Sequence, residues 1–433
     1  MRFQLVSCSI VVAQLLAGCG SDVPIGSGKH NANGVGGTGA TAGSAGASGA
    51  AGAGARPGVG GAAGSGGTAA TGGAAGASGA PSGGSGGVGA TGGGGSTATC
   101  PSNTAAVQRV IPGNNPRDTL QVKGSLYYSE TDLADSKISI VQLPSGAPQV
   151  IGSKALYPAQ AKAFKNADAL VSDGTSIYWR AEEGARIWKM PLAGGTPVEI
   201  ASIPGVLSFG STAGLPDSLT LNATHLFWAQ GSNPVGNSEV EYVLYQVPLS
   251  GGVPKKLGSY QSDTNDIMKT FQPLSLRADA THLYFTRVSG GASGLHRIPL
   301  AGGPDEDVFG SGYYIDLNQT DVYGSAGGVL WRHPKTGGAT SVVSTGLDPN
   351  KYSLVAHGVS LSATHVYSGY LSFVFQGSEL ATCGVVLKSP LAGPSGTPTV
   401  LWEGDGNPLA LSQSASVVAM VDVENESVVL LNP

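Results

Sequence analysis

The stretch that decides the fold reads Val171-Ser-Asp-Gly-Thr-Ser-Ile-Tyr-Trp179 and continues as Arg186-Ile-Trp-Lys-Met-Pro-Leu-Ala-Gly-Gly195. It holds a short strand, a tight polar turn, an aromatic strand, and an apolar strand that ends in Pro before two glycines. A Pro at the end of a strand need not donate to the ladder, and paired glycines supply the positive φ of a hairpin. The phrase therefore predicts three antiparallel strands, and Pro197-Val-Glu-Ile200 follows as a fourth.

The same phrase recurs along the chain, which is the mark of a repeat architecture. Clear copies begin at Leu221 and Ala278, weaker ones at Asn318 and Ser362, an early one at Leu120 and a last one at Leu409. The prolines that end the third strand are Pro144, Pro191, Pro248, Pro299, Pro334, Pro390 and Pro433. Seven units of four short strands predict an all-β, seven-bladed β-propeller, with six blades as the alternative. A β-sandwich does not predict one phrase repeated seven times.

The two ends of the folded part predict how the ring closes. Val428-Val-Leu-Leu-Asn-Pro433 matches a third strand with no fourth strand after it. Ala105-Val-Gln-Arg-Val-Ile111 matches a fourth strand with no blade before it. We therefore expect the N-terminal strand to pair outside the C-terminal strands, which removes an exposed sheet edge.

Two aromatic pairs carry a family resemblance. Tyr178-Trp179 and Phe227-Trp228 stand at the aromatic position of the YWTD-like and TolB-like propellers, and residues 100–433 resemble that group. Tyr323-Gly324 and Tyr367-Ser368 lack the second aromatic residue, and no copy reads Trp-Thr-Asp. The resemblance implies a fold and not an activity, since propellers serve many functions.

The first nineteen residues have the pattern of an export signal. Arg2 precedes an apolar run from Leu5 to Leu16 that is shorter than the roughly 20 residues needed to span a bilayer. Leu16-Ala17-Gly18-Cys19 resembles the bacterial lipobox, which implies a signal peptide at 1–18 and lipidation of Cys19. An ordinary secretory signal is the alternative. Gly20, where some lipoproteins have Asp, favours the outer membrane, so we expect a lipid-anchored protein of the cell envelope.

The composition changes sharply beyond the expected lipidated segment at 19–25. Residues 26–99 consist mostly of Gly, Ala, Ser and Thr with few charges. Such a chain cannot bury enough apolar surface to offset the entropy of folding. We expect a disordered linker with a root-mean-square span of roughly 47 Å, placed between the anchor and a β-propeller at 100–433.

The charge of the folded part excludes one class of partner. Residues 100–433 carry 20 of the chain's 23 Lys and Arg, and 27 of its 28 Asp and Glu. The sequence has no basic run that could neutralise nucleic-acid phosphates. We therefore expect no nucleic-acid partner.

No sequence motif assigns a catalytic, cofactor or metal residue. The chain has no Gly-x-Ser-x-Gly, His-Glu-x-x-His or P-loop pattern in a suitable context. His225, His282 and His365 share one repeat position and so fall on different blades, which favours a turn role over a metal site. The acidic clusters are Asp132 with Asp135, residues 305–307, and residues 403–407. The last loosely resembles a calcium loop but lacks the spaced ligands of one.

Four cysteines are present, and two of them remain in the mature head. Cys8 leaves with the signal peptide and Cys19 is the expected lipid site. Cys100 and Cys383 share an exported compartment, which favours a disulfide. However, Cys100 precedes an expected fourth strand and Cys383 an expected third strand, and these begin on opposite faces. The pair is a possible disulfide that the spacing leaves open.

The lengths of the loops indicate which face of the propeller carries a binding surface. The long connections are residues 151–169, 229–241, 258–272 and 369–384. Each lies between strands two and three or between blades, and both classes emerge on one face of a propeller. Binding residues tend to lie in variable loops on a rigid scaffold. We therefore favour a non-enzymatic module that binds a protein or glycan. The alternatives are a metal-dependent propeller hydrolase or lyase, and a structural envelope protein without a specific ligand.

Overall fold

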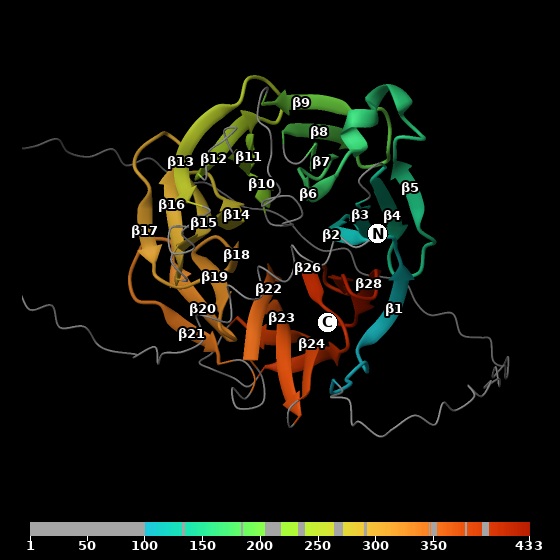
Figure 1. The fold of residues 1–433 in the computed structure, drawn as a ribbon, viewed down its shortest axis with the longest axis vertical. Helices are drawn as coiled ribbons and strands as arrows, with labels where there is room; N and C mark the ends of the chain where they lie inside the picture. Colours follow the sequence, from blue (N-terminus) through green and yellow to red (C-terminus); the bar gives the residue numbers. More distant parts are fainter. Residues whose placement is uncertain are drawn as a thin grey trace, which may run out of the picture. The chain divides into compact units, whose positions relative to one another are not determined.

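Seven sheets form a ring. The computed structural model describes residues 100–433 apart from 132–134, 183–184, 204–217, 233–238, 264–271, 290–291, 346, 348–352, 377–378 and 392–397. Within the described residues, seven antiparallel sheets of four strands each stand around a common axis (Figure 1). The protein is a seven-bladed β-propeller, as the repeat predicts, and the six-bladed alternative is wrong.

The blades follow one another in chain order. Blade one is β2 (Pro116–Val122), β3 (Ser125–Glu130), β4 (Lys137–Gln142) and β5 (Gln149–Gly152). Blade two is β6 (Asp168–Ser172), β7 (Ser176–Ala181), β8 (Arg186–Pro191) and β9 (Val198–Ser202). Blade three is β10 (Leu219–Leu221), β11 (His225–Ser232), β12 (Glu239–Pro248) and β13 (Lys255–Asp263). Blade four is β14 (Gln272–Ala278), β15 (His282–Ser289), β16 (Ala292–Pro299) and β17 (Glu306–Phe309).

The remaining blades complete the ring. Blade five is β18 (Tyr314–Leu317), β19 (Asp321–Ala326), β20 (Val329–Pro334) and β21 (Ser341–Ser344). Blade six is β22 (Ser353–Leu361), β23 (His365–Gln376), β24 (Glu379–Pro390) and β25 (Thr399–Gly404). Blade seven is β26 (Pro408–Gln413), β27 (Val418–Asp422), β28 (Ser427–Leu431) and β1 (Val107–Pro112). A short 3-10 helix, η1 (Pro158–Phe164), lies between blades one and two. First strands line the centre of the ring and fourth strands its circumference (Figure 1).

The repeated phrase forms each blade for reasons that its residues supply. In blade two, Oδ1 of Asp173 accepts a hydrogen bond from the backbone N–H of Ser176 at 2.8 Å, which holds the turn between β6 and β7. Pro191 ends β8 opposite Ser176. Gly194 and Gly195 then have φ of 88° and 133°, values that a residue with a Cβ rarely adopts. The corresponding prolines stand opposite His225, His282, Asp321 and His365 in blades three to six.

Apolar side chains fill every interface between neighbouring blades. In the described part of the chain, each of the seven interfaces has its own cluster. At the interface of blades one and two, Phe164 of η1 stacks on Trp179 with ring centroids 6.0 Å apart. Polar side chains join first strands: Oδ2 of Asp118 accepts the N–H of Leu170 at 2.6 Å. Because each of these seven clusters is shared by two blades, every blade depends on its neighbours for its core.

The ring closes through the N-terminal strand. β1 pairs antiparallel with β28, with Val110 opposite Val429 and Ile111 opposite Val428. Ile111 and Val428 are fully buried against blade one. The prediction of an N-terminal fourth strand for blade seven is therefore confirmed.

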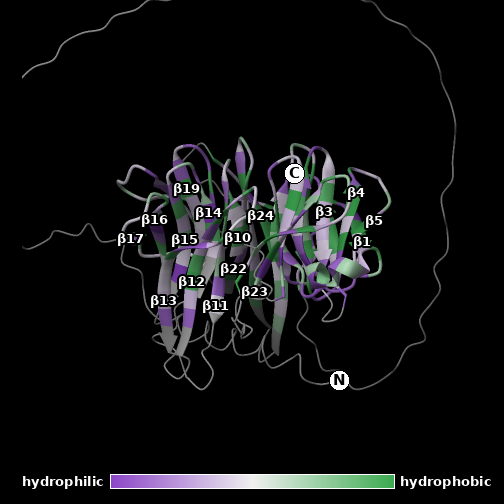
Figure 2. Cartoon of the chain, turned by 90° about the horizontal axis from the view of Figure 1, so that it is seen from above, coloured by the Kyte–Doolittle hydropathy of each residue, from purple (hydrophilic) through white to green (hydrophobic). Residues whose placement is uncertain are grey.

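The two faces of the ring differ. The turn face carries the tight turns between strands one and two and between strands three and four. The hairpin face carries the connections between strands two and three and between blades. Strands of blades three and six extend furthest on the hairpin face (Figure 2). Blade five, by contrast, joins β19 to β20 there through only Gly327 and Gly328.

The expectation of a long loop at 369–384 is wrong. β23 and β24 pair without a gap from His365 opposite Pro390 to Gln376 opposite Glu379. The segment is thus a long hairpin, because Tyr370, Leu371 and Phe373 continue the strand instead of leaving it. Residues 229–241 and 258–272 are also partly strand, and residues 233–238 and 264–271 within them lie outside the described part. No helix among the described residues is long and apolar enough to cross a membrane.

Candidate functional site

The three repeat histidines lie in the turns of the turn face. Nδ1 of His225 lies 2.8 Å from Oγ1 of Thr224, which donates to Oδ1 of Asn222 at 3.1 Å. His282 with Thr281, and His365 with Thr364, repeat the 2.8 Å contact. Each histidine therefore completes a local turn on its own blade.

Two acidic clusters have other roles. Asp305 contacts Arg287 at 3.2 Å and Nδ1 of His296 at 3.2 Å, and Glu306 contacts Arg297 at 2.7 Å. These carboxylates are neutralised within blade four. Asp135 accepts a backbone N–H from Lys154, whereas Asp132 lies outside the described residues. Across the described ranges, no group of three His, Cys, Asp or Glu is placed to hold a metal ion.

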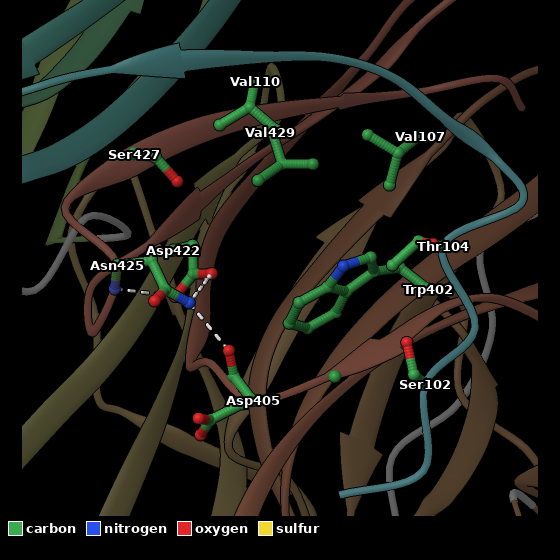
Figure 3. A pocket seen from close by; sticks show the side chains of 11 residues that line it. Ser102, Thr104, Val107, Val110, Trp402, Asp405, Asp422, Asn425, Ser427 and Val429 are labelled. Atoms are coloured by element: carbon green, nitrogen blue, oxygen red, sulfur yellow. Dashed lines mark hydrogen bonds between the residues drawn. The ribbon is translucent and has the colours of Figure 1, made fainter. Parts of the chain in front are cut away.

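The cluster at 403–407 forms one end of a pocket. The pocket is about 410 Å³ in volume and lies between the outer strands of blades six and seven, at the rim of the hairpin face (Figure 3). We call it the rim pocket. Its lining is Ser102, Thr104, Val107, Val110, Trp402, Gly404, Asp405, Asp422, Asn425, Ser427 and Val429.

One half of the rim pocket is apolar. Trp402 of β25, on blade six, faces Val429 of β28, and both belong to the cluster between blades six and seven. Val107 and Val110 of β1 add to this wall, and Val110 is 52% exposed. Figure 3 shows the Trp402 ring between these valines and Asp405. Trp402 and Val429 are only 5% and 4% exposed, so the wall that a ligand would meet consists mainly of Val107 and Val110, with the Trp402 ring packed beside them.

The other half is held by an amide and two aspartates. Nδ2 of Asn425 donates to Oδ2 of Asp422 at 2.8 Å and to the backbone oxygen of Asp405 at 2.7 Å (Figure 3). Asp422 is buried and also accepts the N–H of Asn407 at 3.1 Å. Gly406 packs so close to Asp422 that a Cβ there would overlap its carboxylate. The turn between β27 and β28 of blade seven is therefore held firmly against the end of β25.

The rim pocket is acidic. Partial burial raises the pKa of Glu424 above its ordinary value of 4.5, and the neighbouring charges of Asp405 and Asp422 raise it further. From residue 389 to the end, the sequence has no Lys, Arg or His, and its acids are Glu403, Asp405, Asp422, Glu424 and Glu426. Residues 100–108 add no cation, and Arg109 of β1 donates from Nη1 to the backbone oxygen of Gly146 in blade one at 2.7 Å. The carboxylates around the pocket thus have negative neighbours, and no ion pair of Asp405, Asp422 or Glu424 occurs among the described residues.

The same network reaches the first strand of blade six. Nδ1 of His357 lies 2.8 Å from Oδ1 of Asn407, and since a carbonyl oxygen only accepts, Nδ1 carries the proton. Burial lowers the pKa of His357 to about 4, and the bond to Asn407 opposes this shift. His357 is therefore neutral at physiological pH and fixes Asn407, which in turn orients Asp422.

Residues 100–106, which we call the lead segment, cover one side of the pocket. Cys100 and Cys383 form a disulfide with their Cα atoms 5.5 Å apart. Cys383 lies inside β24, where it pairs with Ser372, and not before the strand as expected. Asn103 then pairs with Glu403 of β25 in an isolated bridge. The lead segment thus starts on the hairpin face beside blade six and crosses to blade seven, so the expected opposition of faces does not arise.

Sequence reasoning missed the rim pocket. Ser102, Trp402 and Asn425 are far apart in the sequence and meet only because the chain ends overlap at the closure. The signal that could have pointed to it is the absence of cations after Lys388. No catalytic, cofactor or metal residue is assigned from the sequence.

Comparisons with known proteins extend to the fold only. No protein-family model matches the chain, and a search of curated proteins found no match. Among solved structures, YCF48 from Cyanidioschyzon merolae is 10% identical, with a TM-score of 0.48 over 78% of this chain and 99% of that one. BamB from Moraxella catarrhalis is 8% identical, with a TM-score of 0.42 over 76% and 99%. A prolyl endopeptidase is 11% identical, with a TM-score of 0.46 over 76% of this chain.

These similarities assign no function. This chain spans about half, 52%, of the prolyl endopeptidase. At such identities a shared propeller says nothing about shared chemistry, because the fold carries unrelated activities. The function has to be argued from the chain's own residues.

Proposed function

We propose that the protein is a lipid-anchored envelope protein whose propeller binds a protein or glycan through its hairpin face. The observation that carries the proposal is the unevenness of that face. Blade six joins β23 to β24 at the end of a twelve-pair hairpin, whereas blade five joins its corresponding strands through two glycines. A rigid ring that presents unequal projections on one side suits recognition of a shaped partner.

The anchor is the second part of the proposal. The lipobox-like Leu16-Ala17-Gly18-Cys19 and the Gly-rich residues 26–99 precede the propeller. Several acyl chains on one cysteine hold a protein stably, since each buried CH₂ contributes about 0.8 kcal/mol. The outer membrane is the proposed site, with residues 26–99 as a flexible spacer.

The anchor is tested by Cys19→Ala in cells fed radioactive palmitate. We expect the wild-type protein to carry label and to sediment with membranes. The variant should lose both properties, while a Cys8→Ala variant should retain them. Equal labelling of the Cys19→Ala variant would overturn the lipid assignment.

Binding is tested by shortening two hairpins in the full chain. Phe373 is joined to Thr382 through two glycines, which keeps Cys383, and Gly231 is joined to Tyr242 in the same way. The proteins are applied to glycan arrays and to cross-linked envelope extracts. We expect the shortened protein to lose a ligand that wild type retains. Ala280→Arg, on the turn face, is the control and should bind normally.

Two outcomes would contradict the binding proposal. The first is unchanged binding after both hairpins are shortened. The second is the absence of any ligand for the wild-type protein, which would favour the structural envelope role.

A further inference from the structure

We propose that the rim pocket binds the side chain of a lysine or arginine that a partner protein presents in an extended segment. The inference rests on the proposed function in taking the ligand to be a protein. It adds the chemistry of recognition and places it at the closure of the ring.

The apolar half of the pocket suits the hydrocarbon part of such a side chain. Lysine and arginine bury their methylene groups along apolar surface while the charged end stays near water or a carboxylate. Val107, Val110 and Val429 form an aliphatic wall, and Trp402 lies beside them. An indole ring also attracts a cation that comes within about 6 Å of its face. A volume of about 410 Å³ is ample for one long side chain.

The carboxylate half suits the charged end. Asp405 is exposed at the pocket's edge, and no hydrogen bond or ion pair of its carboxylate occurs among the described residues (Figure 3). Asp422 is already held in place by Asn425 and Asn407. A cation entering beside Trp402 would therefore meet the exposed carboxylate of Asp405, while the buried, oriented carboxylate of Asp422 adds a second negative charge nearby.

Several aspartates elsewhere in the propeller are paired with a basic side chain. Asp316 pairs with Arg277 at 3.0 Å, and Asp279 pairs with Lys335 at 3.2 Å. Asp168 is buried against Arg180 at 3.1 Å. Around the rim pocket the segments that supply the acids supply no base, and Arg109 of β1 donates to Gly146 of blade one instead, so no ion pair among the described residues neutralises Asp405 or Asp422. Charge complementarity therefore favours a cationic side chain over an anionic or neutral ligand.

The geometry also favours a protein over a free small cation. The pocket is open at the circumference, beside the outer edge of β1, which pairs only with β28 within the described sheet. An extended segment lying along this edge can place alternate side chains toward the ring. One of them would reach the space between Val110 and Asp405.

The test uses the full chain and a defined set of blocked pentapeptides. Their central residue is lysine, arginine or norleucine between alanines and terminal glycines. Saturation-transfer NMR at low ionic strength measures the dissociation constants. We expect the lysine and arginine peptides to bind and the norleucine peptide, which lacks the charge, to bind at least about fivefold more weakly.

Matched variants locate the binding. Asp405→Asn should weaken the lysine peptide about fivefold, whereas Asp307→Asn, at another exposed aspartate, should leave binding unchanged. Val110→Trp should fill the pocket and abolish binding. Val198→Trp, at a similarly exposed valine on the outer strand of blade two, is its control.

Several results would overturn the inference. One is equal binding of the norleucine and lysine peptides, and another is equal binding by the Asp405→Asn and Asp307→Asn proteins. A dimer in sedimentation analysis that Val110→Trp dissociates would assign the pocket to a second copy of the chain. If the peptides do not bind but hairpin shortening abolishes partner binding, the pocket inference fails and the proposed function stands. If the peptides bind but hairpin shortening leaves partner binding unchanged, the pocket inference stands and binding through the hairpins is contradicted.

Discussion

At Gly324 the chain has no side chain because the Trp331 ring occupies the space beside it. The two residues face each other across β19 and β20. In blade two the corresponding positions hold Trp179 and Trp188. Blade five thus keeps the ring on the third strand and lacks the one on the second strand. The Trp331 ring fills the space that a second aromatic residue after Tyr323 would need.

Gly324→Ala should lower the free energy of unfolding by about 1–3 kcal/mol, because the added methyl group overpacks a filled core. Urea unfolding followed by tryptophan fluorescence measures the change. Gly310→Ala is the control, since a Cβ there would meet nothing within 4 Å. Equal midpoints for the two variants would contradict the packing account.

Asp279 predicts a dependence of stability on pH. Burial alone would raise its pKa, but the N–H groups of Thr281 and His282 and the ammonium of Lys335 outweigh this effect and lower it to about 2. A carboxyl with a lowered folded pKa stabilises the fold above its unfolded pKa, near 3.8, and this contribution is lost as the pH falls toward 2. Wild type should therefore lose stability over this range.

The repeat supplies a matched substitution for Asp279. Asn222 holds the same turn in blade three through Oδ1, so Asp279→Asn should keep the turn and lose only the charge. Its urea midpoint should fall less than that of wild type between pH 6 and pH 3. Asp279→Ala should lose about 1 kcal/mol or more at both values, since turn hydrogen bonds disappear. An unchanged pH dependence in Asp279→Asn would contradict the assignment.

Among the elements, β1 is the one that closes the ring. It is the fourth strand of blade seven and buries Ile111 against blade one. Without it, β28 would present Val428, Val429 and Leu430 at an open edge, which invites aggregation.

A chain that begins at Asn114 should therefore melt far below the full protein or precipitate. A chain that begins at Cys100 should melt like the full protein, since it contains every described strand. Differential scanning fluorimetry compares the three proteins. If the Asn114 chain melts with the others, β1 does not close the ring.

The disulfide is the second element that secures the closure. Cys100 and Cys383 are separated by 283 positions, so the bond restricts a large loop of the unfolded chain. Replacing both cysteines by alanine should cost about 2–5 kcal/mol of unfolding free energy. Reduction of wild type should have the same effect in urea unfolding. A double variant as stable as oxidised wild type would contradict this role.

For the whole molecule, the shared interfaces predict a single unfolding transition. Each cluster joins two neighbouring blades, so the loss of one blade exposes the cores of two others. Gly324→Ala should shift the entire urea transition without splitting it. Far-ultraviolet circular dichroism and tryptophan fluorescence should then give coincident curves. Separate transitions would show that blades unfold independently.

At this scale, the fold could be predicted from the sequence and the site could not. The phrase ending at Pro191 and Gly195 encodes a blade locally, and seven copies suffice to define a ring. The closure could also be predicted, because the unmatched strands at Ile111 and Val428 complement each other. The long hairpin of blade six was not predicted, because an apolar run interrupted by polar residues is compatible with a loop as well as with a strand. The rim pocket depends on three segments that no local pattern connects.

The disulfide also determines where a mechanical load enters the propeller. Tension on the chain before Cys100 passes through the sulfur–sulfur bond into β24, which has β23 on one side and β25 on the other. The pull therefore meets a strand inside a four-stranded sheet. It does not reach β1, whose pairing with β28 would open one hydrogen bond at a time if it were pulled from its first residue. A pull on the chain before Cys100 would thus load the sheet of blade six and leave the pairing of β1 with β28 intact.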